Sequence, residues 1–277
     1  MKKRVYILPN NEKPKAVAAA DGICKKITEW DFDARVSAIP ESAEDAGYLS
    51  DADYLVVLGG DGTILQVARA TVEINVPIVG INYGKVGYMA VLGSDDLDEL
   101  RNILLGKYSL QSRMMLDIDI IKGDKSVRSL SRALNEAVVS NGPIPHLVEF
   151  DLYCDGKLCQ HLRSDGIIIA TPTGSSAYSM SAGGPVMDPT LVCICATPIC
   201  PHHLNSRPVI FGGDSVLEIR NAVCRNNVIY LSVDGKEVFE LSSGDVVRIA
   251  RSKHTAPIVT SVSNSFIEVL NSKLSYH

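Results

Sequence analysis

The hydrophobic and polar positions follow two different patterns, and the change between them falls near residue 106. Before it, short apolar runs without polar alternation are separated by segments with apolar residues at helical spacing. We expect strands at 4–8, 54–58 and 77–81, and helices at 14–30, 63–72 and 94–106, the last with Ser94 as its cap and Gly106 as its stop. This order predicts a parallel sheet that helices cover on both faces.

Beyond residue 106, apolar and polar residues alternate. The segments 148–154 and 229–233 do so, and each is followed by Asp-Gly (155–156 and 234–235) and another alternating run. Asp-Gly in this context predicts a β-hairpin, because both central residues of the turn need positive φ. The predicted fold class is therefore α/β + all-β: an N-terminal parallel-sheet α/β domain, then a C-terminal antiparallel, β-rich, sandwich-like domain.

The composition is that of an ordinary globular protein, with 277 residues, 46% hydrophobic and 21% charged. A formal net charge of −5 argues against a protein that coats nucleic acid or a membrane surface. Seven cysteines outside any disulfide-like framework indicate a reducing compartment. The N-terminal apolar run is too short for a signal peptide, and no apolar stretch is long enough to span a membrane, so we expect a cytoplasmic protein.

The turn Gly59-Gly60-Asp61-Gly62 follows a buried apolar run and precedes a helical pattern. Glycines at such a turn let backbone N–H groups approach phosphate oxygens, and the helix adds its positive end. A carboxylate fits this loop if it accepts a proton from an attacking hydroxyl, or if a cation separates it from the phosphates. Both uses point to phosphoryl transfer. The alternative is a tight turn in which Asp61 is the N-cap of the helix.

Three further segments place glycine or polar residues beside predicted strands. The turn 80–90 is glycine-rich but does not match a Walker loop, and it fits a ligand loop or a structural turn equally well. The pair Asn135-Glu136 suits a purine edge and ribose hydroxyls, or is a solvated strand end. The segment 163–185 combines a strand, a break at Pro172 and many hydroxyl side chains, which suits a sugar-phosphate ligand.

The segment 193–203 (CICATPICPHH) brings three cysteines and two histidines together in sequence. No spacing in it matches a standard zinc pattern, and free cysteine packs as a small hydrophobe. We therefore expect a core strand here and no metal site made by the protein alone.

GGDGTIL, GIN-x-G-x-x-G, Asn-Glu and DGIIIATPTGSSAYSMSAGGP occur in this order, and together they resemble the NAD kinases of the prokaryotic type. The resemblance covers most of the chain, and the TPTG-x-x-AYS segment is its specific part. GGDGT alone is shared with diacylglycerol and sphingosine kinases. In the family the chain end returns to the first domain, which implies an N-terminal domain of 1–106 completed by 260–277 and a C-terminal NAD-binding domain of 107–259.

The resemblance also implies a reaction. NAD kinases phosphorylate the 2′-hydroxyl of the adenosine ribose of NAD to give NADP, with ATP or in some cases polyphosphate as donor and a divalent cation such as Mg²⁺. They are soluble homo-oligomers, commonly dimers or tetramers. The implied partners are NAD, ATP and further copies of the chain, with no nucleic acid and no membrane.

The matched motifs imply the site residues. Asp61 is the implied proton acceptor, and Gly59, Gly60, Gly62 and Thr63 form the implied ATP phosphate loop. The implied NAD-binding residues are Asp61, Gly62, Asn135, Glu136, His146, Arg163, Asp165, Ser176, Ala177, Tyr178, Ser179, Met180, Ser181 and Lys236. Ser176 stands where threonine is usual in the family, and Lys236 where glutamine is common.

Two other functions remain open at this point. A lipid kinase of the GGDGT type would carry an Asn-Glu-Val-like sequence after that motif, where this chain has Ile64-Leu65-Gln66, and would lack the TPTGSSAYS segment. A non-catalytic NAD(P)-sensing module would keep the dinucleotide loop without needing an acid at position 61.

Overall fold

The structure is a computed structural model, and it describes residues 2–84, 87–142, 147–203, 205–224, 228–260 and 266–274. The chain divides into two compact units, Met1–Arg113 with Thr255–His277 and Met114–His254. The boundary expected near residue 106 lies shortly before this division. None of the helices in the described part of the chain is long and apolar enough to cross a membrane.

The first unit is built on a parallel sheet, as the sequence predicts. Its strands are β1 (Arg4–Pro9), β2 (Asp33–Val36), β3 (Tyr54–Gly59), β4 (Ile78–Asn82) and β5 (Leu92–Gly93). Its helices are α1 (Pro14–Glu29), α2 (Asp61–Ala70), α3 (Leu97–Leu104) and α5 (Phe266–Leu274), with a 3₁₀ helix at Asp45–Leu49. The order is β4-β3-β1-β2, and both β5 and the end of β17 (Val246–Thr260) pair with β4; every pairing is parallel.

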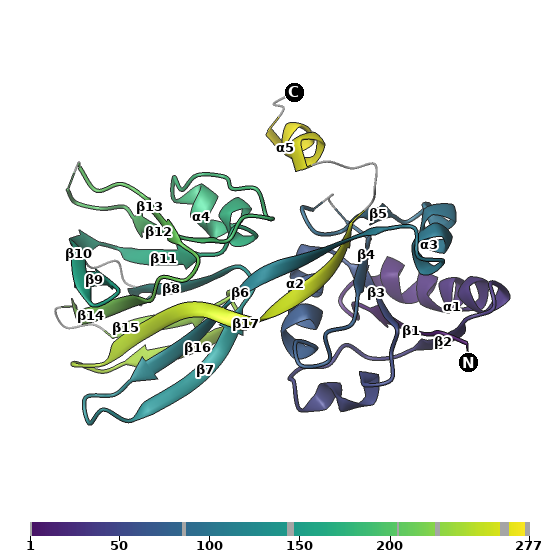
Figure 1. Cartoon of the computed structure of the whole chain (residues 1–277), viewed down its shortest axis with the longest axis horizontal. Coiled ribbons are helices and arrows are strands. Elements are labelled where there is room, and N and C mark those ends of the chain that lie inside the picture. Colours follow the sequence, from purple (N-terminus) through teal and green to yellow (C-terminus); the bar gives the residue numbers. More distant parts are fainter. Residues whose placement is uncertain are drawn as a thin grey trace. The chain divides into compact units, whose positions relative to one another are not determined.

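Helices cover both faces of this sheet. Buried residues of α1 and α3 share one hydrophobic cluster with Tyr54, Val56 and Leu58 of β3 and with Val79 and Ile81 of β4. Gly80, between the last two, faces the other way, and there a β-carbon would collide with Ile64 of α2. The helix α2 therefore packs on the opposite face from α1 and α3 (Figure 1).

The start of the third helix differs from the prediction. Ser94 is not its cap: the helix begins at Leu97, and the Asp96 carboxylate accepts the N–H of Gly93 at 2.7 Å. The prediction failed because an aspartate two residues further on holds the turn that precedes the helix. Gly106, the predicted stop, has a φ of +93°, which glycine adopts without strain.

The second unit is a β-sandwich of two sheets. Its strands are β6 (Ser109–Ile121), β7 (Val127–Ala133), β8 (Glu136–Asn141), β9 (Val148–Cys154), β10 (Lys157–Ser164), β11 (Gly166–Ala170), β12 (Cys193–Ile199), β13 (Val209–Gly212), β14 (Leu217–Cys224), β15 (Ile229–Val233), β16 (Glu237–Leu241) and β17. Short helices lie at Gly174–Ser176 (3₁₀) and at α4 (Tyr178–Ser181). One sheet has the order β10-β9-β14-β17 with β6 and β7, and the other is β13-β12-β11-β8-β15-β16.

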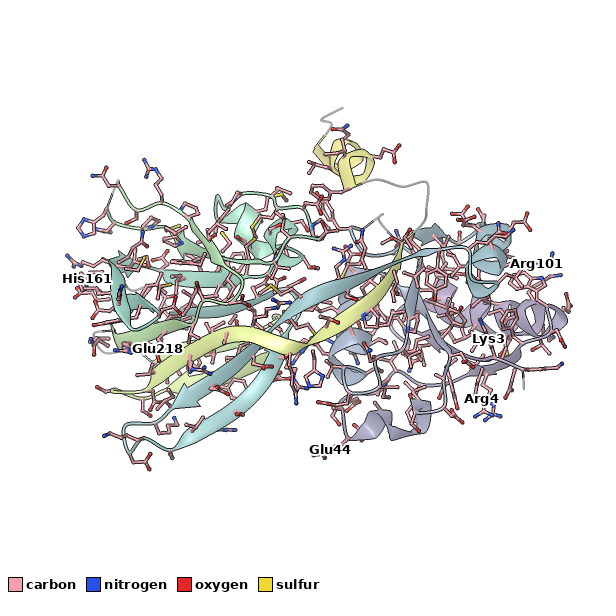
Figure 2. All side chains as sticks on the ribbon, viewed as in Figure 1. Lys3, Arg4, Glu44, Arg101, His161 and Glu218 are labelled. Carbon is pink, nitrogen blue, oxygen red and sulfur yellow. The ribbon has the colours of Figure 1, made fainter. Side chains whose placement is uncertain are left out.

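Alternate residues of both sheets enclose one core, which includes Phe150 of β9, Ile169 of β11 and Leu231 of β15. Side chains fill the space between the sheets (Figure 2). Both predicted hairpins are confirmed, with φ values of +50° and +76° at 155–156 and of +49° and +66° at 234–235. The strand expected around residue 193 is also confirmed as β12, in which Cys195 is fully buried.

Candidate functional site

In the first unit, the turn at 59–62 joins β3 to α2. Gly60 is the N-cap residue and Asp61 is the first residue of the helix, so the interpretation of Asp61 as the cap is wrong. Its carboxylate instead reaches the second glycine-rich turn. Oδ2 accepts the N–H of Tyr88 at 2.6 Å, and Oδ1 accepts those of Met89 at 3.0 Å and Ala90 at 3.4 Å.

Glycine makes this contact possible. A β-carbon on Gly87 would collide with the carboxylate of Asp61, so the two turns approach closely only when residue 87 has no side chain. A carboxylate offers about four lone-pair sites. The three backbone amides take two on Oδ1 and one on Oδ2, which leaves an acceptor position on Oδ2 for a hydroxyl. The half-buried Asp61 is thus held in one orientation with acceptor capacity to spare.

Thr63 supports the turn from inside. The residue is 5% exposed, and Oγ1 accepts the side-chain Nδ2–H of Asn10 at 2.8 Å and the backbone N–H of Gly60 at 3.4 Å. Gly59 packs against it, because a β-carbon there would overlap the threonine. Gly62, by contrast, is exposed, and no atom of the described residues lies within 4 Å of its β-carbon position.

Lys13 is a residue that the sequence analysis missed. Its Nζ atom lies 3.0 Å from the β-carbon position that Gly60 leaves empty and 3.2 Å from that of Gly84. Asn82 Oδ1 is buried, has no hydrogen-bond partner among the residues that the structure describes, and lies 3.8 Å from the same Gly84 position. An ammonium group therefore lies between the two glycine-rich turns. The available signal was a lysine just after the first strand, at the sheet edge where parallel strands end and ligands commonly bind.

In the second unit, Asn135 and Glu136 lie where β8 begins, and their backbone is held from two sides. The carboxylate of Asp234 accepts the N–H groups of Leu134, Asn135 and Glu136 at 2.9, 2.9 and 3.0 Å. From the other side, the N–H of Thr171 donates to the carbonyl of Asn135 at 2.9 Å. The sequence analysis marked Asp234 as a hairpin residue and gave it no role in binding.

The TPTG segment fixes the same dipeptide. Thr171 Oγ1 donates to the Leu134 carbonyl at 2.5 Å, and a β-carbon on Gly174 would collide with the Asn135 carbonyl oxygen. Thr173 Oγ1 is buried, and none of the described residues forms a hydrogen bond with it. Three motifs that are distant in sequence therefore meet at one strand start.

Glu136 is the most perturbed acid in this region. The residue is 7% exposed, and Oε2 is buried with no hydrogen-bond donor in the described part of the chain. Burial, and then the negative charge of Asp234, raise its pKa from 4.5 to about 7. A buried acceptor without a donor is costly to the fold, which is typical of a group that a ligand completes.

The serine-rich loop has an inner and an outer set of side chains. Ser175 and Ser179 are fully buried; Ser175 Oγ donates to the Pro172 carbonyl at 2.6 Å, and Ser179 Oγ lies 3.0 Å from Thr197 Oγ1. The intermediate or exposed positions are Ser176, Ala177, Tyr178, Met180 and Ser181, of which Tyr178 is 46% exposed. Several hydroxyls that suggested a ligand thus hold the loop itself.

Arg163 and Asp165 lie at the other end of β11 from this dipeptide. Gly166 pairs with Ser140 and Ala170 with Glu136, so about four residue steps, roughly 13 Å, separate the two ends. The Arg163 side chain is exposed and forms an ion pair with Glu149 at 2.9 Å. Lys236 is exposed in the 234–235 hairpin. His146 lies outside the described residues.

Comparisons with known proteins match both parts of the chain. The family model for the ATP-NAD kinase N-terminal domain matches residues 9–108, and that for the ATP-NAD kinase C-terminal domain matches residues 134–261. A NAD kinase from Symbiobacterium thermophilum is 38% identical and covers 96% of each chain. One from Citrifermentans bemidjiense is 33% identical and covers 99% of each chain.

Solved structures agree in fold. A yeast NADH kinase complexed with NADH has a TM-score of 0.86 and 26% identity, and the alignment covers 100% of this chain and 89% of that one. A NAD kinase from Archaeoglobus fulgidus in complex with ATP has a TM-score of 0.75 and 24% identity over 98% of each chain. Because the named relatives match over nearly their whole length, they exclude the GGDGT lipid kinases as an alternative, and the chain belongs to the NAD kinase family.

Proposed function

We propose that this NAD kinase transfers the γ-phosphoryl group of ATP to the 2′-hydroxyl of the adenosine ribose of NAD, with Asp61 as the proton acceptor. Membership of the family supports the reaction. The orientation of the Asp61 carboxylate by three backbone amides, with an acceptor position left on Oδ2, is the observation that carries the residue assignment.

The transfer requires one proton acceptor and an alignment of the 2′-hydroxyl with the γ-phosphoryl group. The 2′-oxygen attacks the γ-phosphorus, the bond between that phosphorus and the β,γ-bridging oxygen breaks, and ADP leaves with the electron pair. The hydroxyl proton passes to Asp61 Oδ2. A positioned base contributes about 10²- to 10⁴-fold in rate, and phosphoryl transfer depends mainly on alignment and charge neutralisation.

The donor phosphates need local positive charge, because the chain as a whole is acidic. We assign them to the turn of Gly59, Gly60 and Gly62, where the positive end of the ten-residue α2 helix adds to Lys13. Thr63 stays in this loop: its hydroxyl oxygen accepts from Asn10 and Gly60, which leaves its O–H free to donate to a phosphate oxygen.

The second unit supplies the NAD-binding groups. We assign ribose hydroxyls to Glu136, whose Oε2 receives no hydrogen bond from the described residues, and base or ribose contacts to the neighbouring Asn135. The loop positions Ser176, Ala177, Tyr178, Met180 and Ser181 are assigned to the dinucleotide, with Ser179 as a support. Arg163 and Asp165 stay in the set, because a dinucleotide can reach along a five-residue strand. Lys236 stays in it because its hairpin also carries Asp234, which contacts the dipeptide.

Mg²⁺ is expected with the donor. Among the residues described, no group of three His, Cys, Asp or Glu side chains could hold a metal ion, and two of the Asp61 lone-pair sites on Oδ1 are taken by amides. The cation therefore fits the triphosphate better than a protein cage, and it would neutralise phosphate charge there.

An NAD analogue that lacks the 2′-hydroxyl of the adenosine ribose tests the proposed reaction. Purified protein with ATP, Mg²⁺ and NAD should form NADP⁺, detected with an NADP-specific dehydrogenase. The analogue 2′-deoxyadenosine NAD should bind competitively and should not be phosphorylated. Phosphate transfer to the analogue would place the reaction at another hydroxyl and contradict the proposal.

We also propose a cytoplasmic homodimer or homotetramer. The six cysteines whose state the structure describes are all free, which suits a reducing compartment. Ile210 on β13 and Val238 on β16 are 51% and 61% exposed on the outer strands of the six-stranded sheet, where a second copy would cover them. Sedimentation velocity showing only monomers at micromolar concentration would contradict the assembly.

A further inference from the structure

We propose that Asp234 is a positioning residue for NAD recognition: it fixes the backbone of the Asn135–Glu136 dipeptide and controls the charge of the ligand-binding carboxylate. The inference rests on the proposed role of that dipeptide in NAD binding. It extends the site to a residue in the hairpin between β15 and β16.

The contact is unusually complete for one side chain. Asp234 is 7% exposed, and its two oxygens accept three successive N–H groups, those of Leu134, Asn135 and Glu136. Its own N–H donates to the Glu136 carbonyl at 3.0 Å. A neutral amide at this position would have one acceptor oxygen, and its NH₂ group would face a backbone donor.

The chain contains an internal comparison for this residue. Asp155 begins the other Asp-Gly hairpin with a φ of +50°, against +49° at Asp234. Asp155 is exposed, and its carboxylate accepts one backbone N–H, that of Val216, at 2.9 Å. The turn alone therefore does not require burial of the carboxylate or a triple contact, and those features belong to position 234.

The second effect is electrostatic. Glu136 lies on β8 between β11, with Ala170 opposite it, and β15, which leads into Asp234. Among the described residues, Asp234 is the charged group that raises the Glu136 pKa beyond the effect of burial. Ribose hydroxyls donate to the charged form of Glu136, so NAD binding should weaken as the pH falls through the pKa of about 7.

The test measures KM for NAD, KM for ATP and kcat across this pH range in wild type, Asp234→Asn, Asp155→Asn and Glu136→Gln. Asparagine tolerates the positive φ of both turns. For Asp234→Asn we expect KM for NAD to rise roughly 5- to 50-fold above neutral pH, since a backbone donor loses its partner. We also expect the midpoint of the KM profile to move to lower pH, because a neighbouring negative charge is removed. KM for ATP should stay within about 2-fold, and Asp155→Asn should match wild type.

The outcomes separate this inference from the site assignment. If Glu136→Gln leaves KM for NAD unchanged, the Asn135–Glu136 dipeptide is not in the NAD site. The proposed assignment of NAD-binding residues in the second unit is then wrong. If Glu136→Gln weakens NAD binding and removes the pH dependence while Asp234→Asn behaves like Asp155→Asn, only the role of Asp234 is wrong. If Asp234→Asn raises KM for NAD but leaves the midpoint of the pH profile where it is, Asp234 positions the dipeptide and does not control the charge of Glu136.

A measurement on the wild-type protein tests the electrostatic effect even if Asp234→Asn does not fold. Carboxyl ¹³C NMR, with Glu136 assigned through Glu136→Gln, should show a titration near 7 that moves to lower pH when NAD is added. A Glu136 titration near the ordinary 4.5 would overturn the electrostatic part. Asp234→Gly, which suits the same φ and lacks the carboxylate, then replaces Asp234→Asn in the kinetic comparison.

Discussion

The carboxylate of Asp61 occupies the space that a side chain on Gly87 would need. The acid of the first glycine-rich turn and the third glycine of the second are therefore parts of one arrangement. Asp61 also receives the three N–H groups that follow Gly87. Because the proposed base is oriented by a turn distant in sequence, changes in that turn should alter catalysis through Asp61.

Gly87→Ala tests this relationship directly. The added methyl group must displace the Asp61 carboxylate, and a shift of about 1 Å in a catalytic group can cost about 10²-fold in rate. We expect kcat to fall 10- to 100-fold, with KM for NAD within about 3-fold. Gly22→Ala in α1 is the control, since no atom in the described part of the chain lies within 4 Å of its β-carbon position. It should keep full activity and gain roughly 0.5–1 kcal/mol of stability. A folded Gly87→Ala enzyme with wild-type kcat would show that the Asp61 orientation is unimportant.

Asp61→Asn should lose both activity and some stability. The amide cannot accept all three N–H groups, and an unsatisfied buried donor costs about 1–3 kcal/mol. The kcat should fall by roughly 10²- to 10⁴-fold, the usual contribution of a general base. Activity must be compared well below the melting temperature, so that the folded fraction is the same. Asp96→Asn, which alters an aspartate bonded to the Gly93 amide, controls for a simple turn defect. Near wild-type turnover in folded Asp61→Asn would end the proposed mechanism.

Lys13→Gln should affect the donor and spare the acceptor. Its ammonium group lies beside Gly60 and Gly84, and a charge-assisted contact to phosphate is worth about 1.5–3 kcal/mol. We expect KM for ATP to rise roughly 10- to 150-fold, with KM for NAD changed less than about 3-fold. Lys15→Gln removes an exposed lysine two residues away and should behave as wild type. If both variants show the same KM for ATP, Lys13 does not contact the phosphates.

The elements of the fold that could be predicted are those that a short stretch of sequence defines by itself. Buried runs such as 54–58 and Asp-Gly pairs such as 234–235 define strands and hairpins through neighbouring residues alone, and the structure confirms both kinds. The cap of α3 was missed because Ser94 and Asp96 are both good turn residues, and only the Asp96 contact to Gly93 decides between them.

The sequence motifs of the candidate site could be predicted, but the contacts that hold its side chains in place could not. The Asp61 contact joins residues 27 apart and the Asp234 contact to Asn135 joins residues 99 apart, and their partners are backbone N–H groups, which every residue except proline possesses. No side-chain pattern can mark such partners. For the same reason, the hydroxyls of Ser175 and Ser179 suggested a ligand, although they bond to the Pro172 carbonyl and to Thr197.

Glu136 should reduce the stability of the protein above neutral pH. Its pKa is raised in the folded state, so the folded protein disfavours the charged form that the unfolded chain accepts. The penalty is absent below about pH 4.5, grows as the pH rises towards 7, and is complete above it. The difference between 4.5 and about 7 corresponds to about 3 kcal/mol at most. Glu136→Gln, a neutral isostere, should therefore be more stable than wild type near pH 8 and nearly equal to it near pH 4.5.

Denaturant unfolding at the two pH values measures this difference in stability. Glu240→Gln, at an exposed position on β16, is the control for loss of one carboxylate. A stability difference that is the same at both pH values would mean that Glu136 is not held in a raised-pKa environment, and that its burial costs the fold nothing at neutral pH.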